Sequence, residues 1–219
     1  MTRIGDLTGK TVVDVACGEG FFTRQLCEAG AAQVVGVDLS EQMIALAREQ
    51  EAREPLGIEY RVEDARVPGP PQAFDLAVAA WLLVYARTRE ELGAMCRGVA
   101  RRLAPGGRFV TLTANPDLVR WQSRPPNYRT YGFDIRLPVS VCEGSPIVWT
   151  IHLDDSSFEI ENYYLPMAAH ESALHEAGFR NVSVHLPTLA PHPQGADEGD
   201  NWAEMLTYPP MILIEGVKT

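Results

Sequence analysis

The sequence predicts an α/β protein built on a doubly wound sheet, in which parallel strands alternate with helices. Apolar, β-branched runs recur along the chain and are separated by segments with helical periodicity, a pattern that favours right-handed crossover connections. The first run enters a glycine-containing turn at residues 16–20, and the second run ends on Asp38. Together these features are typical of a βαβ unit that binds a nucleotide.

Seven short segments, either apolar throughout or alternating between apolar and polar residues, are the expected strands of this sheet. They lie at residues 12–15, 34–37, 58–62, 76–83, 109–113, 182–186 and 211–217. The run at 76–83 is nearly all apolar, as expected for a strand that is buried on both faces.

Helices are expected in four of the segments between these strands. They follow the glycine turn, and then span about 40–54, 89–103 and 167–177. Ser40 can cap the N-terminus of the second helix, Pro105 to Gly107 close the third, and Gly178 ends the fourth.

Residues 116–165 differ from the rest of the chain, because they are rich in aromatic residues, prolines and alternating patterns. Residues 148–153 and 157–163 predict a β-hairpin. We therefore expect one domain over residues 1–219, with 116–165 inserted as a substrate cover. A long loop is expected at 187–210.

Composition excludes several classes of function. The formal net charge of −10 argues against a surface that follows nucleic-acid phosphates. The sequence has neither an apolar run of 18 residues nor a signal-peptide pattern, so we expect a soluble, cytoplasmic protein. The cysteines lack the spacing of metal ligands, and we expect neither a disulfide nor a metal site.

The glycine turn itself favours a particular kind of nucleotide. Thr23 stands where a dinucleotide fingerprint needs its third glycine, and Phe21 and Phe22 would crowd a pyrophosphate. Asp14 and Glu19 flank the turn with negative charge, which repels phosphate and attracts cations. S-adenosylmethionine carries an ammonium and a sulfonium group and no phosphate, so it is the expected cofactor.

These motifs resemble those of the class I S-adenosylmethionine-dependent methyltransferases. The similar segments are Asp14 to Gly20 with its Cys-Gly-x-Gly sequence, Asp38 at the end of the second strand, and the Leu-x-Pro-Gly-Gly turn at 103–107. The resemblance covers nearly the whole chain, and it implies a Rossmann-like, mostly parallel sheet whose last strand is antiparallel. By overall pattern the chain is similar to enzymes of bacterial secondary metabolism and antibiotic biosynthesis, including those that tailor toxoflavin-like azapteridines.

Ligands of doubly wound folds lie at the C-terminal ends of the strands, so residues that follow the first four strands form the expected cofactor site. They are Asp14, Ala16, Gly18, Gly20, Asp38, Leu39, Met43, Asp64, Ala65, Ala80 and Trp81. The carboxylate of Asp38 can accept bonds from two ribose hydroxyls. A helix N-cap is the alternative role for Asp38.

Gly18 and Gly20 would let the backbone approach the methionine part of the cofactor. The resemblance implies that Met43 packs on the adenine ring and that Asp64 accepts a bond from the adenine amino group. A core position for Met43 and a shift of one residue from Asp64 to Glu63 are the alternatives.

Tyr85 and His170 are the candidate catalytic residues. Methyl transfer from a sulfonium needs alignment, exclusion of water and, for some acceptors, deprotonation. Tyr85 follows the fourth strand, and His170 lies at the start of the fourth helix. The further donors and acceptors in the inserted segment are Tyr128, Tyr131, His152 and Tyr164.

The aromatic residues of the insertion could form a cleft for a flat heterocyclic or phenolic acceptor, or a separate small core. They are Trp121, Phe133, Trp149 and Phe158. We expect residues 116–165 and 187–208 to cover the cofactor.

The sequence therefore predicts a metal-independent methyltransferase that acts on a nitrogen or oxygen of a small aromatic or heterocyclic metabolite. The alternatives are an S-adenosylmethionine-binding protein without methyl transfer, as a scaffold or regulatory partner, and a non-methylating enzyme of the same fold. The expected partner is a small-molecule acceptor, not nucleic acid or a membrane. The sequence leaves open whether the protein forms a homodimer.

Overall fold

The computed structural model describes residues 3–67, 73–121, 126–189 and 202–219. Seven strands form the main sheet: β1 (Thr11–Val15), β2 (Gln33–Asp38), β3 (Glu59–Val62), β4 (Phe74–Ala80), β5 (Leu103–Ala114), β9 (Phe179–His185) and β10 (Met211–Lys218). Their order is β3-β2-β1-β4-β5-β10-β9. Strand β10 runs antiparallel to both of its neighbours, whereas β1 to β5 pair in parallel. The predicted doubly wound sheet with an antiparallel last strand is confirmed.

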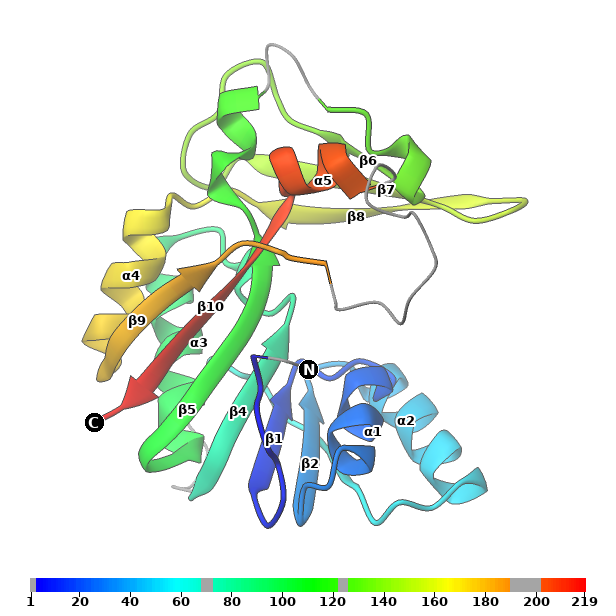
Figure 1. Ribbon diagram of the computed structural model, residues 1–219, viewed down its shortest axis with the longest axis vertical. Coiled ribbons are helices and arrows are strands. Elements are labelled where there is room, and N and C mark those ends of the chain that lie inside the picture. The colour runs from blue at the N-terminus through cyan, green and yellow to red at the C-terminus, as the bar shows by residue number, and fades with distance from the viewer. Residues whose placement is uncertain (1–2, 68–72, 122–125, 190–201) are drawn as a thin grey trace.

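Helices cover both faces of this sheet (Figure 1). They are α1 (Phe21–Glu28), α2 (Glu41–Arg53), α3 (Arg89–Arg102) and α4 (Met167–Glu176). The Ser40 hydroxyl accepts a bond from the Met43 N–H at 3.2 Å, so it caps α2 as predicted. One boundary differs from expectation, because β5 begins directly after α3, where Leu103 pairs with Phe74.

Alternation along the strands divides the core into two layers. Val13 and Val35 pack in the cluster that includes α3 and α4, and the preceding residues, Val12 and Val34, pack in the cluster that includes α1 and α2. Because successive strand residues point to opposite faces, a strand of continuous valines supplies both layers. This explains why the central strands read as unbroken apolar runs.

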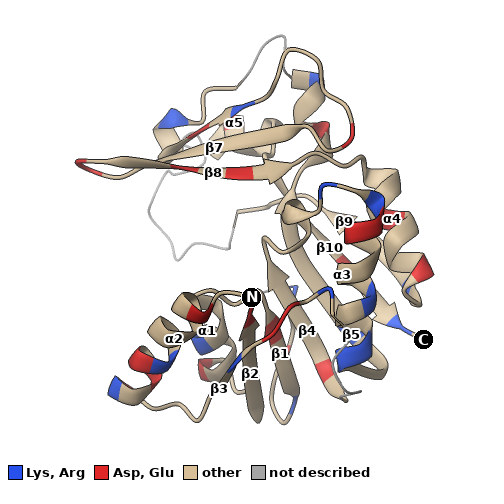
Figure 2. Cartoon of the chain, turned by 180° about the vertical axis from the view of Figure 1, so that it is seen from behind, with Lys and Arg blue, Asp and Glu red and all other residues tan. Residues whose placement is uncertain are grey.

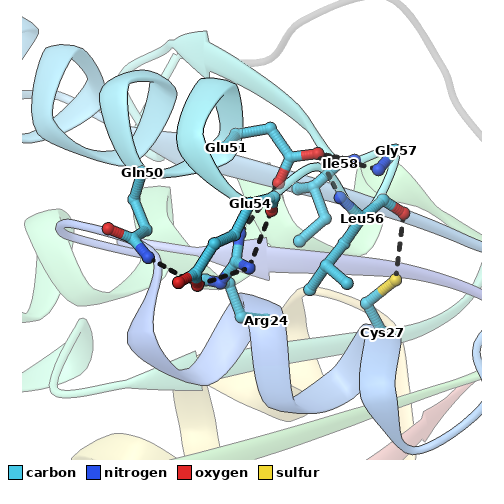
Figure 3. A network of polar contacts seen from close by, with 8 residues as sticks. All are labelled: Arg24, Cys27, Gln50, Glu51, Glu54, Leu56, Gly57 and Ile58. Carbon is cyan, nitrogen blue, oxygen red and sulfur yellow. Dashed lines mark hydrogen bonds and ion pairs between the residues drawn. The ribbon is translucent and has the colours of Figure 1, made fainter.

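Glu51 joins α1, α2 and the segment before β3 (Figure 3). One carboxylate oxygen accepts bonds from the N–H groups of Leu56, Gly57 and Ile58 at 2.7, 2.7 and 3.2 Å. The other oxygen pairs with Arg24 of α1 at 3.0 Å. These contacts attach both helices to the edge of the sheet next to the glycine turn.

Replacing Glu51 by alanine should lower the free energy of unfolding by about 2–3 kcal/mol, because several bonds to a charged acceptor are lost together. The matched control is Glu49→Ala on the same helix. Within the described residues Glu49 pairs with Arg53 alone, and both side chains are 63% exposed, so a change below about 0.5 kcal/mol is expected. Urea unfolding measures both values, and equal effects would contradict the special role of Glu51.

A second, small sheet lies beyond the end of β5 (Figure 1). It consists of β6 (Phe133–Arg136), β7 (Pro146–His152) and β8 (Ser157–Tyr163). The predicted hairpin corresponds to β7 and β8, whereas β6 was not expected, because four residues carry too little pattern to identify a strand. The inward residues on one face of these strands include Phe133, Ile147 and Trp149, all of which are buried.

A short helix, α5 (Ala203–Thr207), corrects the expectation of a continuous loop at 187–210. Around this helix, Tyr131 stacks on Trp202 with ring centroids 5.3 Å apart, and the Tyr128 hydroxyl donates to the Tyr208 carbonyl at 2.6 Å. These contacts fasten the small sheet to the chain that enters β10. Residues 190–201 of the expected loop and cover lie outside the described residues.

The charged residues are spread over the molecule. Figure 2 shows lysines and arginines dispersed among aspartates and glutamates, without a continuous basic stripe on the side in view. Within the residues that the structure describes, no helix combines the length and the apolar character needed to cross a bilayer.

Candidate functional site

A cavity of about 700 Å³ lies where β1, β2, β3 and β4 end. Nine of the eleven residues expected to bind the cofactor line it: Ala16, Gly18, Asp38, Leu39, Met43, Asp64, Ala65, Ala80 and Trp81. Tyr85, from a 3₁₀ turn at Leu83–Tyr85, also lines this cavity. The fold thus brings together residues that are up to 79 positions apart in the chain, from Ala16 to Met95.

The two glycines of the turn have different roles. Gly18 has φ +57° and a β-carbon there would meet no atom within 4 Å, so this residue opens the cavity wall. Gly20 does not line the cavity, because a β-carbon there would lie 2.4 Å from the Tyr60 hydroxyl. The cavity lining gives no support to the expectation that Gly20 approaches the cofactor, whereas the missing side chain of Gly20 makes room for Tyr60.

Asp14 is also absent from the cavity lining, contrary to expectation. It is only 1% exposed, and its carboxylate accepts a bond from the Thr23 hydroxyl at 2.7 Å. Burial raises the pKa of Asp14 from 3.8 to about 6, the Thr23 hydrogen bond opposes this rise, and the Asp38 charge adds to it. Thr23 therefore stabilises the turn by linking α1 to Asp14 of β1, a role that the sequence pattern did not indicate.

The raised pKa of Asp14 predicts a pH dependence of stability. Between pH 4 and about 6 the folded chain binds more protons at Asp14 than the unfolded chain does, so this group's contribution to stability falls as pH rises and is level above that range. In the wild-type protein this group should lower the free energy of unfolding by about 3 kcal/mol between pH 4 and 6, and Asp14→Asn should not show this decrease. Urea unfolding from pH 4 to 8 measures it, with Asp154→Asn in an exposed turn as control. Parallel pH profiles for wild type and Asp14→Asn would contradict the assignment.

Asp38 connects the ends of the first two strands. One carboxylate oxygen accepts the Gly18 N–H at 2.9 Å, and the other accepts the Ser40 N–H at 2.8 Å. A carboxylate can accept about four hydrogen bonds, so Asp38 retains capacity toward a ligand in the cavity that it lines. The alternative role, in which Asp38 is the N-cap of α2, does not apply, because Ser40 is the N-cap residue of that helix.

Asp64 and Glu63 both line the cavity but have different partners. Arg66 binds Asp64 through two nitrogens, at 3.0 and 2.8 Å, and this hydrogen bonding holds the pKa of Asp64 below its usual value. Glu63 is engaged by the buried Arg102 at 2.8 Å. Both groups contribute acidic character next to the apolar surface of Ala65.

Two residues at the cavity have a strained backbone. Ala16 has φ +64° and Trp81 has φ +68°, and only one other non-glycine residue in the described ranges has a positive φ. Such conformations cost on the order of 1–3 kcal/mol and concentrate at functional sites. At Trp81 the turn is held by its N–H, which donates to the Leu112 carbonyl at 2.9 Å.

A second cavity, of about 210 Å³, adjoins the first. Trp81 and Tyr85 belong to both cavities. The other walls come from the small sheet and consist of Trp149, Ile151, Ile160 and Asn162. Two hollows that meet at shared side chains can hold two molecules in contact, as a group transfer requires.

The charges of the larger cavity fit a cationic nucleoside better than a diphosphate. Asp38, Glu63 and Asp64 line it, and among the described lining residues the one cation, Arg66, is paired with Asp64. This negative character comes from the strand ends, not from Asp14 as the sequence suggested. Leu39 and Met43 add exposed apolar surface that suits a flat base.

Comparison with known proteins agrees with this geometry. Residues 12–107 match the model of a methyltransferase domain family. N-demethylindolmycin N-methyltransferase of Streptomyces griseus is 29% identical over 84% of this chain and 77% of the relative. An S-adenosylmethionine-dependent methyltransferase structure from Mesorhizobium loti is 26% identical, with a TM-score of 0.68 over 99% of this chain and 94% of the other. The chain is therefore similar to the class I S-adenosylmethionine-dependent methyltransferases, and the matched domain contains the glycine turn and the ends of β1 to β4.

Another relative of this methyltransferase matches over a shorter length. Ubiquinone biosynthesis O-methyltransferase of Idiomarina loihiensis is 32% identical over 52% of this chain. The matched region spans 46% of that relative. The cofactor of this methyltransferase family is S-adenosylmethionine. The carboxylates and apolar side chains that line the larger cavity fit this molecule.

The structure does not bring His170 to the methyltransferase site. His170 is 4% exposed within α4, where its Nδ1 lies 3.2 Å from the Pro166 carbonyl. Burial lowers the pKa of this imidazole, so it is neutral at pH 7. Because His170 lines neither cavity, its expected action on the acceptor is not supported by the geometry.

Other side chains expected to touch the acceptor have structural partners instead. Trp121 packs edge-on against Tyr208, and Phe133 stacks on Tyr128. His152 lies 2.8 Å from Asp134. Of the aromatic residues proposed as cleft walls, Trp149 is the one that lines the second cavity.

Sequence reasoning missed several members of the larger cavity: Ser40, Glu63 as a lining residue, Arg66 and Met95. Most of them are neighbours of predicted residues on the same loops, so a wider window after each strand would have included them. Met95 comes from α3, and nothing in its local sequence distinguishes it from the other core residues of that helix.

Proposed function

We propose that this protein transfers a methyl group from S-adenosylmethionine in the larger cavity to a nitrogen or oxygen of a small aromatic or heterocyclic molecule in the second cavity. The observation that carries this proposal is that Trp81 and Tyr85 line both cavities. The N-methyltransferase and O-methyltransferase relatives named above support both kinds of acceptor atom.

In this proposal each end of the cofactor meets a different part of the larger cavity. Asp38 accepts bonds from the ribose hydroxyls, and Asp64 accepts from the adenine amino group. Met43 packs on the base, and its 38% exposure at the cavity supports this role over a core position. The strained backbone at Ala16 and Trp81 faces the methionine part.

The bound cofactor supplies an electrophilic methyl group with a good leaving group, so the protein chiefly has to align the acceptor and exclude water. The second cavity has no carboxylate or imidazole among its described lining residues. Burial raises the pKa of Tyr85, so its hydroxyl stays protonated at neutral pH and acts as a hydrogen-bonding, orienting group. The acceptor therefore provides its own lone pair.

We also propose that residues 116–165 form the substrate cover of a single methyltransferase domain. The small sheet of this segment closes the second cavity with apolar side chains from β7 and β8, Trp149, Ile151 and Ile160. Such a wall displaces water from the point of transfer, which prevents loss of the methyl group to solvent.

Mass spectrometry tests the proposed function. The protein is incubated with S-adenosylmethionine and a panel that contains N-demethylindolmycin, phenols and neutral nitrogen heterocycles. We expect at least one product heavier by one methylene, together with S-adenosylhomocysteine. Cofactor binding in calorimetry without product from any acceptor would favour a binding protein without methyl transfer, and absence of cofactor binding would contradict the proposal altogether.

A further inference from the structure

The indole N–H of Trp149 is buried without a hydrogen-bond partner among the described residues. Trp149 is only 5% exposed, and a buried donor that lacks an acceptor costs about 1–3 kcal/mol. Most such groups in folded proteins have a partner. Trp149 also lines the second cavity, so the indole side chain that carries this unpaired N–H borders a space in which a ligand can bind.

The position of Trp149 places its side chain beside the proposed point of methyl transfer. Trp149 lies on the inward face of β7 and packs edge-on against Trp81, with ring centroids 5.4 Å apart. Trp81 borders the cofactor cavity as well. The other two buried atoms without a partner, Tyr60 Oη and Arg102 Nε, belong to residues that line neither cavity.

The remaining walls of the second cavity are neutral. Ile151 and Ile160 provide apolar surface, and Asn162, which is 3% exposed, provides an amide. The Nδ2 of Asn162 donates to the Glu161 carbonyl at 3.2 Å. No charged side chain lines this cavity in the described part of the chain, so a charged acceptor would lose its hydration without an ionic partner.

We propose that Trp149 selects the acceptor: its indole N–H donates to a ring nitrogen or carbonyl oxygen of an uncharged, planar heteroaromatic molecule. This inference rests on the proposed function. Trp81 packs along the flat ring, while the Asn162 amide and the Tyr85 hydroxyl orient the edge that carries the nucleophilic atom. An acceptor without a lone pair at the Trp149 position leaves the buried N–H unpaired and binds more weakly.

Three probes of matched shape test this selection in the presence of saturating S-adenosylhomocysteine. Quinoline has a ring nitrogen with a lone pair, naphthalene has none, and N-methylquinolinium is a cation without a free lone pair. Calorimetry or fluorescence titration should show that wild type binds quinoline about tenfold tighter than naphthalene. Equal binding of these two probes would overturn the inference, and so would tightest binding of N-methylquinolinium, because the cavity would then be an aromatic cage for cations.

Trp149→Phe should abolish the preference for quinoline while leaving the affinity for S-adenosylhomocysteine unchanged. Trp121→Phe is the matched control, because Trp121 belongs to the same inserted segment and lines neither cavity. This control should keep the preference. Retention of the preference in Trp149→Phe would overturn the role of Trp149.

A measurement on the wild-type protein avoids dependence on the folding of Trp149→Phe. In proton–nitrogen correlation spectra, the indole N–H signal of Trp149 should move downfield with quinoline and stay in place with naphthalene. The signal can be assigned by replacing Trp149 with tyrosine or by elimination among the four tryptophans. An indole N–H signal whose chemical shift does not change at saturating quinoline would contradict the inference.

The two proposals fail in different ways. Loss of S-adenosylhomocysteine binding, or absence of methyl transfer to every acceptor, would contradict the proposed function. Cofactor binding and methyl transfer with no lone-pair preference would contradict only the selection by Trp149.

Discussion

Replacement of Asp38 by alanine should weaken the binding of S-adenosylhomocysteine by about 1.5–3 kcal/mol, which corresponds to roughly 10- to 150-fold. The change removes a charged acceptor that faces the larger cavity and also releases the Gly18 and Ser40 N–H groups. Because Gly18 forms part of the wall, the turn loses its anchor at the same time. Isothermal titration calorimetry measures the affinity directly.

Asp38→Asn separates the two effects of this change. An amide oxygen can still accept one of the backbone N–H bonds, but it lacks the charge and the second acceptor that the ribose requires. We therefore expect an intermediate loss for Asp38→Asn and no loss for Glu41→Ala, an acidic control in the first turn of α2. Unchanged affinity in Asp38→Ala would mean that the ribose lies elsewhere.

Replacement of Gly98 by alanine should destabilise the fold by about 3 kcal/mol or more. A β-carbon at this buried position of α3 would lie 1.8 Å from the Ala65 carbonyl oxygen. Since the obstacle is backbone, α3 or the loop after β3 has to move. That loop carries Asp64 and Ala65 of the cavity wall, so cofactor affinity should fall together with the melting temperature.

Gly93→Ala is the matched control on the same helix. Gly93 is also buried, but a β-carbon there would meet only the Arg97 guanidinium at 2.9 Å, and this flexible side chain can move aside. Alanine is favoured over glycine within a helix by up to about 1 kcal/mol. Thermal and urea unfolding should show Gly93→Ala at or above wild-type stability. A similar loss in both variants would contradict the close approach of α3 to Ala65.

The positions of the strand ends, and with them most of the cofactor cavity, could be predicted from local sequence. Continuous apolar runs, the glycine turn and the carboxylate of Asp38 are short-range features, and the doubly wound topology places their C-terminal ends at one edge. Nine of the eleven expected residues therefore line the larger cavity. The expected seven-stranded sheet was right for the same reason.

The two expected cofactor residues that lie outside the cavity lining, Asp14 and Gly20, make contacts across elements. Gly20 makes room for Tyr60 of β3, and Asp14 points to Thr23 of α1. The turn motif is the same whether its acidic residue faces a ligand or the interior. Only the packing of β3 and α1 around the turn decides between these directions.

The sequence by itself determined the class of fold, the cofactor and the order of the elements, because periodicity and turn chemistry act within a few residues. Tertiary structure alone decided that His170 is packed away from the site and that Trp149 meets Trp81 across 68 positions of chain. Such pairs depend on how the small sheet folds back over the end of β4. Side chains that meet in this way carry no shared local pattern, so the acceptor cavity became visible only in three dimensions.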